Sequence, residues 1–429
     1  MRKKKRSATV AKSSLSRKSV SKKPKPSQPS VRAKPITPPF PIPSGPATTV
    51  KGIRYWSNPH YTRVVIDADK ETMFAHRLLR KDPAIGKPPR LYVDLNNSRL
   101  ADNFQKVISI NDNLLSDARA GQYTPKLVRV VVDLKSFETY KLFSLRNPFR
   151  IVIDIRGTQK TPKKSQQLTA SIPKDGAKLG TSALARQLAL GVRRIVIDPG
   201  HGGKDYGAPG YLKGVHEKNL TLQIARRLRD KIKTELGCEV FLTRNSDKYL
   251  TLEERTAIAN TLNADLFVSI HTNSHRDRRA FGIETYILNF ATDNEAILVA
   301  ARENATSAKN ISDLQTILTD LMHHTKVDES SRLASHVQST MHKNLKKNYS
   351  QIRDKGVKHA PFYVLLGAEM PAILIETAFI SNSRECKRLV SRAYQTAMVD
   401  AISSGIKKYI HETNPTALLN NKPASGGKG

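Results

Sequence analysis

The chain has only two cysteines, Cys238 and Cys386, among its 429 residues. So few thiols exclude a fold that depends on a framework of disulfides, and the two are not spaced as cysteine metal ligands are. We therefore interpret both side chains as buried, unpaired thiols.

Long apolar runs are also missing, because no segment approaches the roughly 18 residues that a membrane-spanning helix requires. Residues 1–6 are strongly basic and would suit the charged start of an export signal. The most apolar stretch that follows, residues 8–11, is too short to be the hydrophobic part of such a signal. The sequence alone therefore predicts no export route.

Acidic residues are scarce, since 72 lysines and arginines stand against 37 aspartates and glutamates and give a net charge of +35. Residues 1–40 hold 13 of the basic residues and no acidic one, so the remaining chain still carries +22. This excess predicts a polyanionic partner: nucleic acid, anionic lipid or an acidic cell-wall polymer. Nucleic acid is not expected, because the basic stretches lack interleaved aromatic residues and no zinc-finger spacing occurs.

Composition divides the chain into five zones. Residues 1–49 are basic and proline-rich and are expected to be disordered, and residues 158–192 read as a basic linker. Residues 50–157 hold short β-branched runs, whereas residues 193–412 alternate strand-like and helix-like patterns. Residues 413–429 form a flexible tail. Residues 50–157 and residues 193–412 are the two expected folded domains.

Four runs in residues 50–157 repeat one pattern, in which an arginine and an aspartate enclose three mostly β-branched residues. Short strands at this spacing, with little helical periodicity, predict a small all-β sandwich. The four runs are 63–67, 90–94, 129–133 and 150–154.

The zone 193–412 is predicted to be an α/β domain, a mixed sheet with helices on both faces. A capping box at Thr251 and Glu254 marks one helix start. Strands are expected at 194–198, 239–243, 266–270, 283–288 and 372–376, and helices at 217–236, 252–263, 293–305, 311–324, 329–348 and 391–411.

Two of these strands end in a histidine: one leads into Asp198-Pro-Gly-His201 and the other into His271. Open α/β sheets bind ligands at the carboxyl ends of their strands, and the glycines beside His201 allow close approach. Glu217 begins a helix after a glycine-rich loop and can reach the same edge. Two imidazoles and one carboxylate can hold a catalytic zinc that keeps a fourth position for water.

Glu376 closes an apolar strand at the same edge, where it is well placed as a general acid/base. His216 and His275 lie near the other candidates and are less favoured as ligands. Asn273 is an open candidate for shaping the site.

Four ordered motifs resemble those of the zinc-dependent N-acetylmuramoyl-L-alanine amidases with an Amidase_3 catalytic domain, the bacterial cell-division amidases. The resemblance spans about residues 193–412. The preceding β zone resembles the AMIN domain, which binds peptidoglycan. The motifs occupy residues 196–203, 217–218, 269–273 and 376–382.

The resemblance implies that His201, Glu217 and His271 hold one Zn²⁺ per catalytic domain and that Glu376 is the catalytic acid/base. The implied reaction is hydrolysis of the amide between N-acetylmuramic acid and L-alanine in peptidoglycan, by a zinc-activated water whose proton Glu376 passes to the leaving nitrogen. It serves cell-wall remodelling and daughter-cell separation. The implied location is the periplasm or cell envelope.

Residues 291–350 are longer than a loop in a compact domain requires. The resemblance implies a regulatory helical insertion here, which covers the zinc until an activator protein of the LytM type displaces it. Glu295 or Glu303 could then occupy the open zinc position.

Two other functions remain open at this point. A zinc peptidase acting on wall peptides would share the metal chemistry but is disfavoured, because no His-Glu-x-x-His is present. A non-catalytic wall-binding protein would require a lost ligand, and none is missing. The basic segment 1–49 could attach the protein peripherally to anionic lipid or to the wall.

Overall fold

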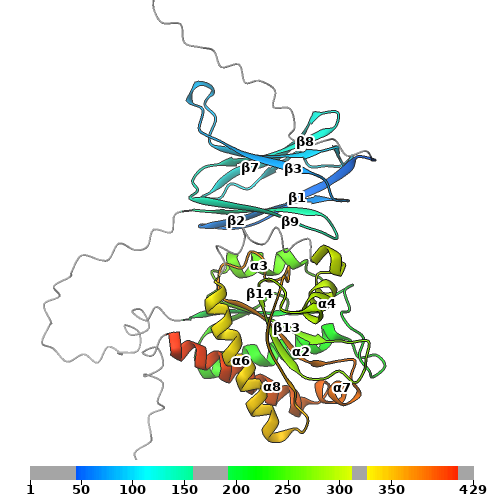
Figure 1. Cartoon of the computed structure of the whole chain (residues 1–429). Helices are drawn as coiled ribbons and strands as arrows, with labels where there is room; N and C mark the ends of the chain where they lie inside the picture. Colours follow the sequence, from blue (N-terminus) through cyan, green and yellow to red (C-terminus); the bar gives the residue numbers. More distant parts are fainter. Residues whose placement is uncertain (1–44, 158–191, 312–325, 414–429) are drawn as a thin grey trace, which may run out of the picture. The chain divides into compact units, whose positions relative to one another are not determined.

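The computed structural model describes residues 45–157, 192–311 and 326–413. Most of the expected segments 1–49, 158–192 and 413–429 lies outside these ranges. The helix expected at 311–324 also lies outside them, except for Ile311. Strands alone, with one short 3-10 helix, make up residues 45–157, whereas residues 192–413 combine strands and helices (Figure 1). In the described part of the chain no helix is both long and apolar enough to cross a membrane.

The all-β region consists of two five-stranded sheets, ordered β5-β1-β2-β10-β9 and β3-β4-β8-β7-β6. Their inner faces share one apolar core, to which Val64 and Ile153 contribute from one sheet and Val93 and Val130 from the other. This confirms the predicted sandwich. The strands are β1 (Thr48–Asn58), β2 (Tyr61–Ala68), β3 (Phe74–Leu79), β4 (Arg90–Asn96), β5 (Ser98–Leu100), β6 (Val107–Ser109), β7 (Leu115–Thr124), β8 (Leu127–Leu134), β9 (Thr139–Leu145) and β10 (Arg150–Arg156), with the 3-10 helix at Pro83–Ile85.

The repeated sequence pattern has a simple structural meaning. Its four copies lie on β2, β10, β4 and β8, and each sheet pairs two copies in antiparallel register. Antiparallel pairing of two such runs places an arginine opposite an aspartate at each end. Arg63 Nε thus lies 2.6 Å from Asp154 Oδ1, and Arg129 Nε lies 2.6 Å from Asp94 Oδ1. One end of each pair of runs is therefore joined by a cross-strand ion pair, whereas Asp67 and Asp133 at the other ends pair with Arg54 and Arg119.

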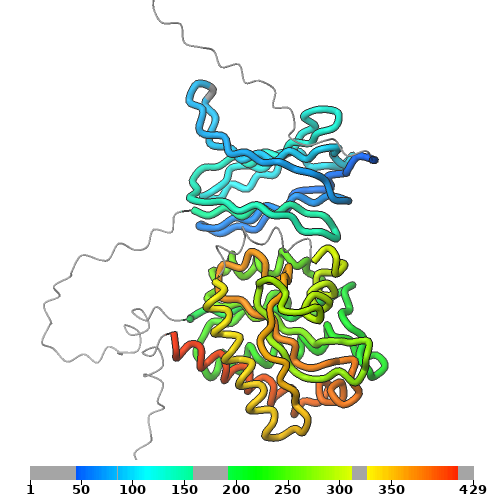
Figure 2. Tube along the Cα trace, viewed as in Figure 1, coloured from blue at the N-terminus to red at the C-terminus, as the bar shows by residue number. Residues whose placement is uncertain are grey.

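The α/β region is built on a six-stranded sheet ordered β12-β11-β13-β16-β14-β15, in which β14 runs antiparallel to β16. Figure 2 traces the Cα path of this region, coloured from green to red along the chain. Its strands are β11 (Arg194–Pro199), β12 (Glu239–Leu242), β13 (Leu266–Asn273), β14 (Ile283–Leu288), β15 (Asp354–Ala360) and β16 (Ala372–Phe379). Its helices are α2 (Glu217–Leu236), α3 (Leu252–Thr261), α4 (Asn294–Glu303), α6 (Val327–Asn348), α7 (Ser383–Leu389) and α8 (Arg392–Thr413).

Side chains alternate between two apolar cores, one on each face of this sheet. Ile195 and Ile197 of β11 pack with α2, α6 and α8, whereas Val196 points into the core that includes α3 and α4. The predicted mixed sheet with helices on both faces is therefore confirmed. Cys238 and Cys386 are both buried and free, as expected from the sequence.

Helix α6 lies inside the segment 291–350, which the sequence marked as a regulatory insertion. Its apolar face is part of the main core, where Leu333, Val337, Met341 and Leu345 are fully buried. The helix is thus an integral layer of the domain. Among the described residues of the segment, those of α4 are therefore the candidates for a regulatory role.

Candidate metal centre

His201 lies just beyond the end of β11, in a turn that holds its backbone in the left-handed region with φ of 60°. The neighbouring Gly200 is required there, because a Cβ at this position would lie 2.4 Å from the ring of His271. Asp205 orients the imidazole, since its Oδ2 lies 2.9 Å from His201 Nδ1. The other ring nitrogen, Nε2, is thereby left free for a ligand.

Glu217 is the first residue of α2 and is completely buried. Its Oε2 accepts a hydrogen bond of 2.9 Å from the Ala208 amide, and its Oε1 accepts one of 2.9 Å from the Thr272 amide. These two bonds fix a carboxylate against the tip of β13, which carries His271.

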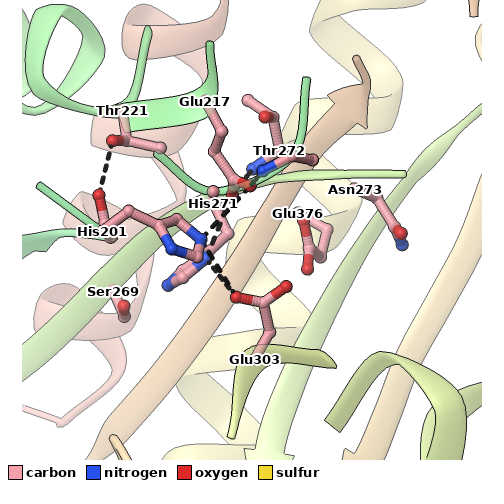
Figure 3. A network of polar contacts seen from close by, with 12 residues as sticks. His201, Glu217, Thr221, Ser269, His271, Thr272, Asn273, Glu303 and Glu376 are labelled. Atoms are coloured by element: carbon pink, nitrogen blue, oxygen red, sulfur yellow. Dashed lines mark hydrogen bonds and ion pairs between the residues drawn. The ribbon is translucent and has the colours of Figure 1, made fainter. Parts of the chain in front are cut away.

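Four side chains converge at this edge of the sheet: His201, Glu217, His271 and Glu303 (Figure 3). One nitrogen or oxygen from each lies within 4.8 Å of those of the other three. His201 Nε2 is 3.2 Å from both Glu217 Oε2 and Glu303 Oε2, and His271 Nδ1 is 3.2 Å from Glu217 Oε1 and 3.0 Å from Glu303 Oε2. The sequence predicted His201, Glu217 and His271 as zinc ligands, and it named Glu303 as one of two candidates for the open zinc position.

The donor set fits a metal such as zinc. His201 Nε2 and Glu303 Oε2 are buried and have no hydrogen-bond partner among the described residues, although they lie close together. Such atoms are expected where side chains point at a common ligand and not at one another. Neutral imidazoles and carboxylates are ligands that zinc accepts, and three of them would leave a fourth position open.

The electrostatics of the cluster favour positive charge. Burial alone would lower the pKa of His271, but Glu303 and Glu217 raise it to about 9. Burial alone would raise the pKa of Glu217, but His201 lowers it to about 2. Two buried carboxylates facing two imidazoles therefore make a site that stabilises a cation.

Glu376 lies on β16 directly across from His271 in the parallel register. Its side chain is fully buried, and neither carboxylate oxygen has a hydrogen-bond partner among the described residues. Burial and the nearby charge of Glu303 raise its pKa well above the usual range. A buried carboxyl group that can hold a proton beside the cluster is suited to general acid/base chemistry.

Arg302 binds the C-terminal end of α4 to the loop after β13, beside the cluster. Its guanidinium donates to the Ser274 carbonyl at 2.5 Å and to Asn273 Oδ1 at 3.1 Å. It also lies 3.0 Å from Glu303 Oε1 and 3.8 Å from Glu376 Oε1. Asn273 thus acts on the site through Arg302.

The remaining candidates lie elsewhere. Glu295, the second regulatory candidate, pairs with Lys355 at 2.6 Å and Lys358 at 3.2 Å and does not join the cluster. His216 is the N-cap of α2, stacked edge-on against the ring of Tyr206. His275 is exposed in the loop after β13.

Two functional residues were not predicted from the sequence, Asp205 and Arg302. Asp205 follows His201 by four residues in a glycine-rich loop, and a carboxylate near a metal-binding histidine is a recognisable signal. Arg302 carries no such signal, because its role depends on the loop after β13, which only the fold brings to it.

Comparison with known proteins identifies the relatives of the chain. The family model described as "N-acetylmuramoyl-L-alanine amidase" matches residues 195–408, and the AMIN domain model matches residues 80–143. N-acetylmuramoyl-L-alanine amidase AmiC of Escherichia coli is 30% identical over 84% of this chain and 89% of its own length. AmiC of Neisseria meningitidis is 30% identical over 86% and 93%. A solved structure of amidase AmiC2 of Nostoc punctiforme is 34% identical over 51% of this chain and 97% of its own, with a TM-score of 0.38.

Proposed function

The chain belongs to the N-acetylmuramoyl-L-alanine amidase family, and from this premise we propose that it hydrolyses peptidoglycan with one zinc ion held by His201, Glu217 and His271. The observation that carries the proposal is the convergence of these three buried side chains, with Nε2 of His201 free of any hydrogen bond. When bound, zinc supplies polarisation of the amide carbonyl and activation of the attacking water.

The residues around the ion have separate tasks in this proposal. Asp205 holds the proton of His201 on Nδ1, so that Nε2 is the ligand atom. Glu376 accepts the proton of the attacking water and delivers it to the leaving nitrogen of L-alanine. Its burial supports this role, because a carboxyl group with a raised pKa both takes and returns a proton readily.

We propose that α4 holds the enzyme in an inhibited state through Glu303. The Glu303 carboxylate lies within 3.2 Å of a ring nitrogen of both histidines, so it would compete with water for the open position of a bound zinc. Arg302 fixes the same end of the helix to the loop after β13. Activation then requires a partner that moves α4, and an activator of the LytM type is our proposal for it.

The β sandwich has the family match expected of a wall-targeting module. We propose that it brings the catalytic domain to peptidoglycan in the periplasm or cell envelope, and that the reaction serves the separation of daughter cells. The positive charge of the chain supports association with an acidic wall polymer.

Labelled peptidoglycan incubated with the purified, zinc-loaded protein tests the activity. We expect free stem peptides and intact glycan strands, and we expect a chelator to abolish their release. Cleavage within the peptides would instead identify a wall peptidase. Binding without cleavage, unchanged by the chelator, would identify a wall-binding protein.

The Glu303→Gln variant tests the inhibition, with Glu295→Gln on the same helix as the matched control. Losing a charged ligand should raise basal hydrolysis about 10- to 100-fold in Glu303→Gln, because a charge-assisted contact then no longer competes for the ion. Glu295→Gln should hydrolyse at the wild-type rate. Equal basal rates in the wild type and Glu303→Gln would contradict the proposal. Point variants are preferable to deleting residues 291–350, since α6 belongs to the core.

A further inference from the structure

A second cavity of the catalytic domain, of about 720 Å³, lies outside the metal centre. It is formed by the loop after β13, the ends of α6 and β16, helix α7 and the start of α8. The residues used in the argument below are Arg278, Arg384, Lys387, Arg388, Tyr349 and Tyr394. We call this cavity the arginine pocket.

The arginine pocket gathers cations that are not held in ion pairs within the described part of the chain. Among the described residues, Arg278, Arg384, Lys387 and Arg388 form no ion pair with a carboxylate. Arg384 and Arg388 donate only to neutral groups, the Gln351 side chain and the Ser350 carbonyl. A surface that gathers four cations outside ion pairs is predisposed to bind an anion.

Several polar atoms of the pocket are buried and lack a partner. They are Arg384 Nε, Arg388 Nη1 and the hydroxyl of Tyr394, a residue that is only 1% exposed. Leaving a buried donor unpaired is costly, and a ligand that accepts these hydrogen bonds would remove the cost. The pocket therefore offers unused donors together with unused positive charge.

Aromatic rings hold the two guanidinium groups in place. Arg384 stacks over the ring of Phe281 at 4.9 Å, and Arg388 over the ring of Tyr349 at 5.3 Å. Tyr349 in turn packs edge-on against Tyr394 at 4.9 Å. Planar donors that are fixed in this way suit the flat, two-oxygen acceptor of a carboxylate.

The acidic residue that lies closest in sequence does not occupy the pocket. The Glu385 carboxylate accepts hydrogen bonds from the backbone amides of Gly282 and Phe379. It does not form an ion pair with Arg384 or Arg388 within the described chain. The charges of Arg384 and Arg388 act to lower the pKa of Glu385 without a direct contact, and their unpaired N–H groups remain available to a ligand from outside.

We propose that the arginine pocket is a subsite for a carboxylate of the peptide attached to the scissile amide. The inference rests on the proposed amidase function and adds a substrate feature to it. The stem peptide of peptidoglycan carries free carboxylates on its acidic residues and at its C-terminus. The pocket would therefore favour substrates whose peptide keeps these groups ionised.

The place of the pocket along the chain supports this choice of ligand. One of its lining residues, Asn382, lies six residues after Glu376, so the two Cα atoms are at most about 22 Å apart. A stem peptide of five residues can span about 18 Å, and long side chains of the pocket cover the remainder. Asn382 Nδ2 also donates to the Arg278 carbonyl at 2.9 Å, which joins the two sides of the pocket.

The experiment compares two soluble muropeptides, one with free peptide carboxylates and one with these carboxylates amidated. The pocket variant is Arg384→Gln with Arg388→Gln, and the control is Arg226→Gln with Arg229→Gln on α2, which removes the same charge elsewhere. We expect the pocket variant to raise KM for the acidic muropeptide about 10- to 100-fold, with kcat little changed. KM for the amidated muropeptide should stay the same in all three proteins.

A second variant, Lys387→Glu, keeps the test valid if the double variant does not fold. Lys387 lines the same pocket but is exposed, so its replacement should not disturb the fold. It should also raise KM for the acidic muropeptide alone. Equal KM values for both muropeptides in wild type and variants would overturn the subsite while leaving the amidase function intact. Failure of both the wild type and the Glu303→Gln variant to cleave either muropeptide would contradict the amidase function itself.

Inorganic phosphate provides a further arm, since a phosphate group offers similar acceptor oxygens. Phosphate binding that the pocket variant loses, combined with equal KM values for the two muropeptides, would assign the pocket to a phosphate group. That result would overturn the peptide assignment.

Discussion

Two buried clusters of charged side chains meet at the end of β11, and they are built in opposite ways. In the first, Asp198 accepts from Thr243 at 2.5 Å and Arg255 at 2.8 Å on one oxygen, and from Ser269 at 2.8 Å on the other. In the second, three residues along, His201 presents a buried nitrogen without a hydrogen-bond partner.

The difference in hydrogen bonding distinguishes a cluster that stabilises the fold from a cluster that can bind a ligand. Burial alone would raise the pKa of Asp198, but Arg255 and the two hydroxyl groups hold it below the usual range. A buried carboxylate whose oxygens all accept hydrogen bonds stabilises the fold and has no free atom with which to bind a ligand. Converging atoms that lack partners, as in the metal cluster, instead indicate a binding site.

The largest expected effect comes from breaking the metal cluster. His271→Ala removes one of the three proposed zinc ligands, and activity should fall by roughly a thousandfold or more, because metal catalysis is worth several kcal/mol. Zinc content and turnover of the purified variant check this. His216→Ala is the matched control and should keep both. Equal losses in the two variants would contradict the ligand assignment.

The next effect comes from breaking the Asp198 cluster. Asp198→Ala leaves the Arg255 guanidinium buried without its carboxylate, which should lower the free energy of unfolding by about 3–5 kcal/mol. Denaturant titration measures the loss, and zinc content at low temperature should stay near that of the wild type. A variant of normal stability that no longer holds zinc would reverse the roles of the two clusters.

The smallest effect concerns Glu385, a buried carboxylate whose partners are mainly backbone amides. Burial raises the pKa of Glu385 to about 7, above its value of roughly 4.3 in an unfolded chain. The folded state therefore binds this proton more tightly. The resulting stability, on the order of 3 kcal/mol, is fully present below pH ~4.3 and is lost as the pH rises through 7.

Glu385→Gln should remove this slope. The difference in unfolding free energy between wild type and variant, measured from pH 4 to 8, isolates the contribution from other titrating groups. A difference that does not change with pH would show that folding leaves the pKa of Glu385 unchanged, which would contradict the rise that burial is expected to cause.

The sequence was sufficient for most of the α/β fold. The helix 217–236 and the strand 283–288 were predicted with the bounds that the structure has, because apolar periodicity and flanking glycines mark them. Two short elements, β15 and α7, were missed. The strand β15 reads Asp-Lys-Gly-Val-Lys-His-Ala, lies at the edge of the sheet and lacks the apolar alternation that reveals a strand.

The candidate site was predictable where a functional residue begins or ends a regular element. Glu217 begins α2, and His201, His271 and Glu376 each lie within three residues of the end of a strand, where the topology of the sheet brings such positions together. The sequence left Glu295 and Glu303 as equal candidates on one helix. Their difference depends on the tertiary contacts of Arg302 and of the lysines on β15, which no local pattern encodes. The arginine pocket was missed for the same reason.

The central claim is that Glu376 carries protons and does not hold the metal. The most direct test is the zinc content and turnover of Glu376→Gln beside the wild type, assayed on labelled peptidoglycan. We predict an unchanged zinc content and a turnover lower by roughly 10²- to 10⁴-fold. Full turnover in a variant that retains its zinc would contradict the account.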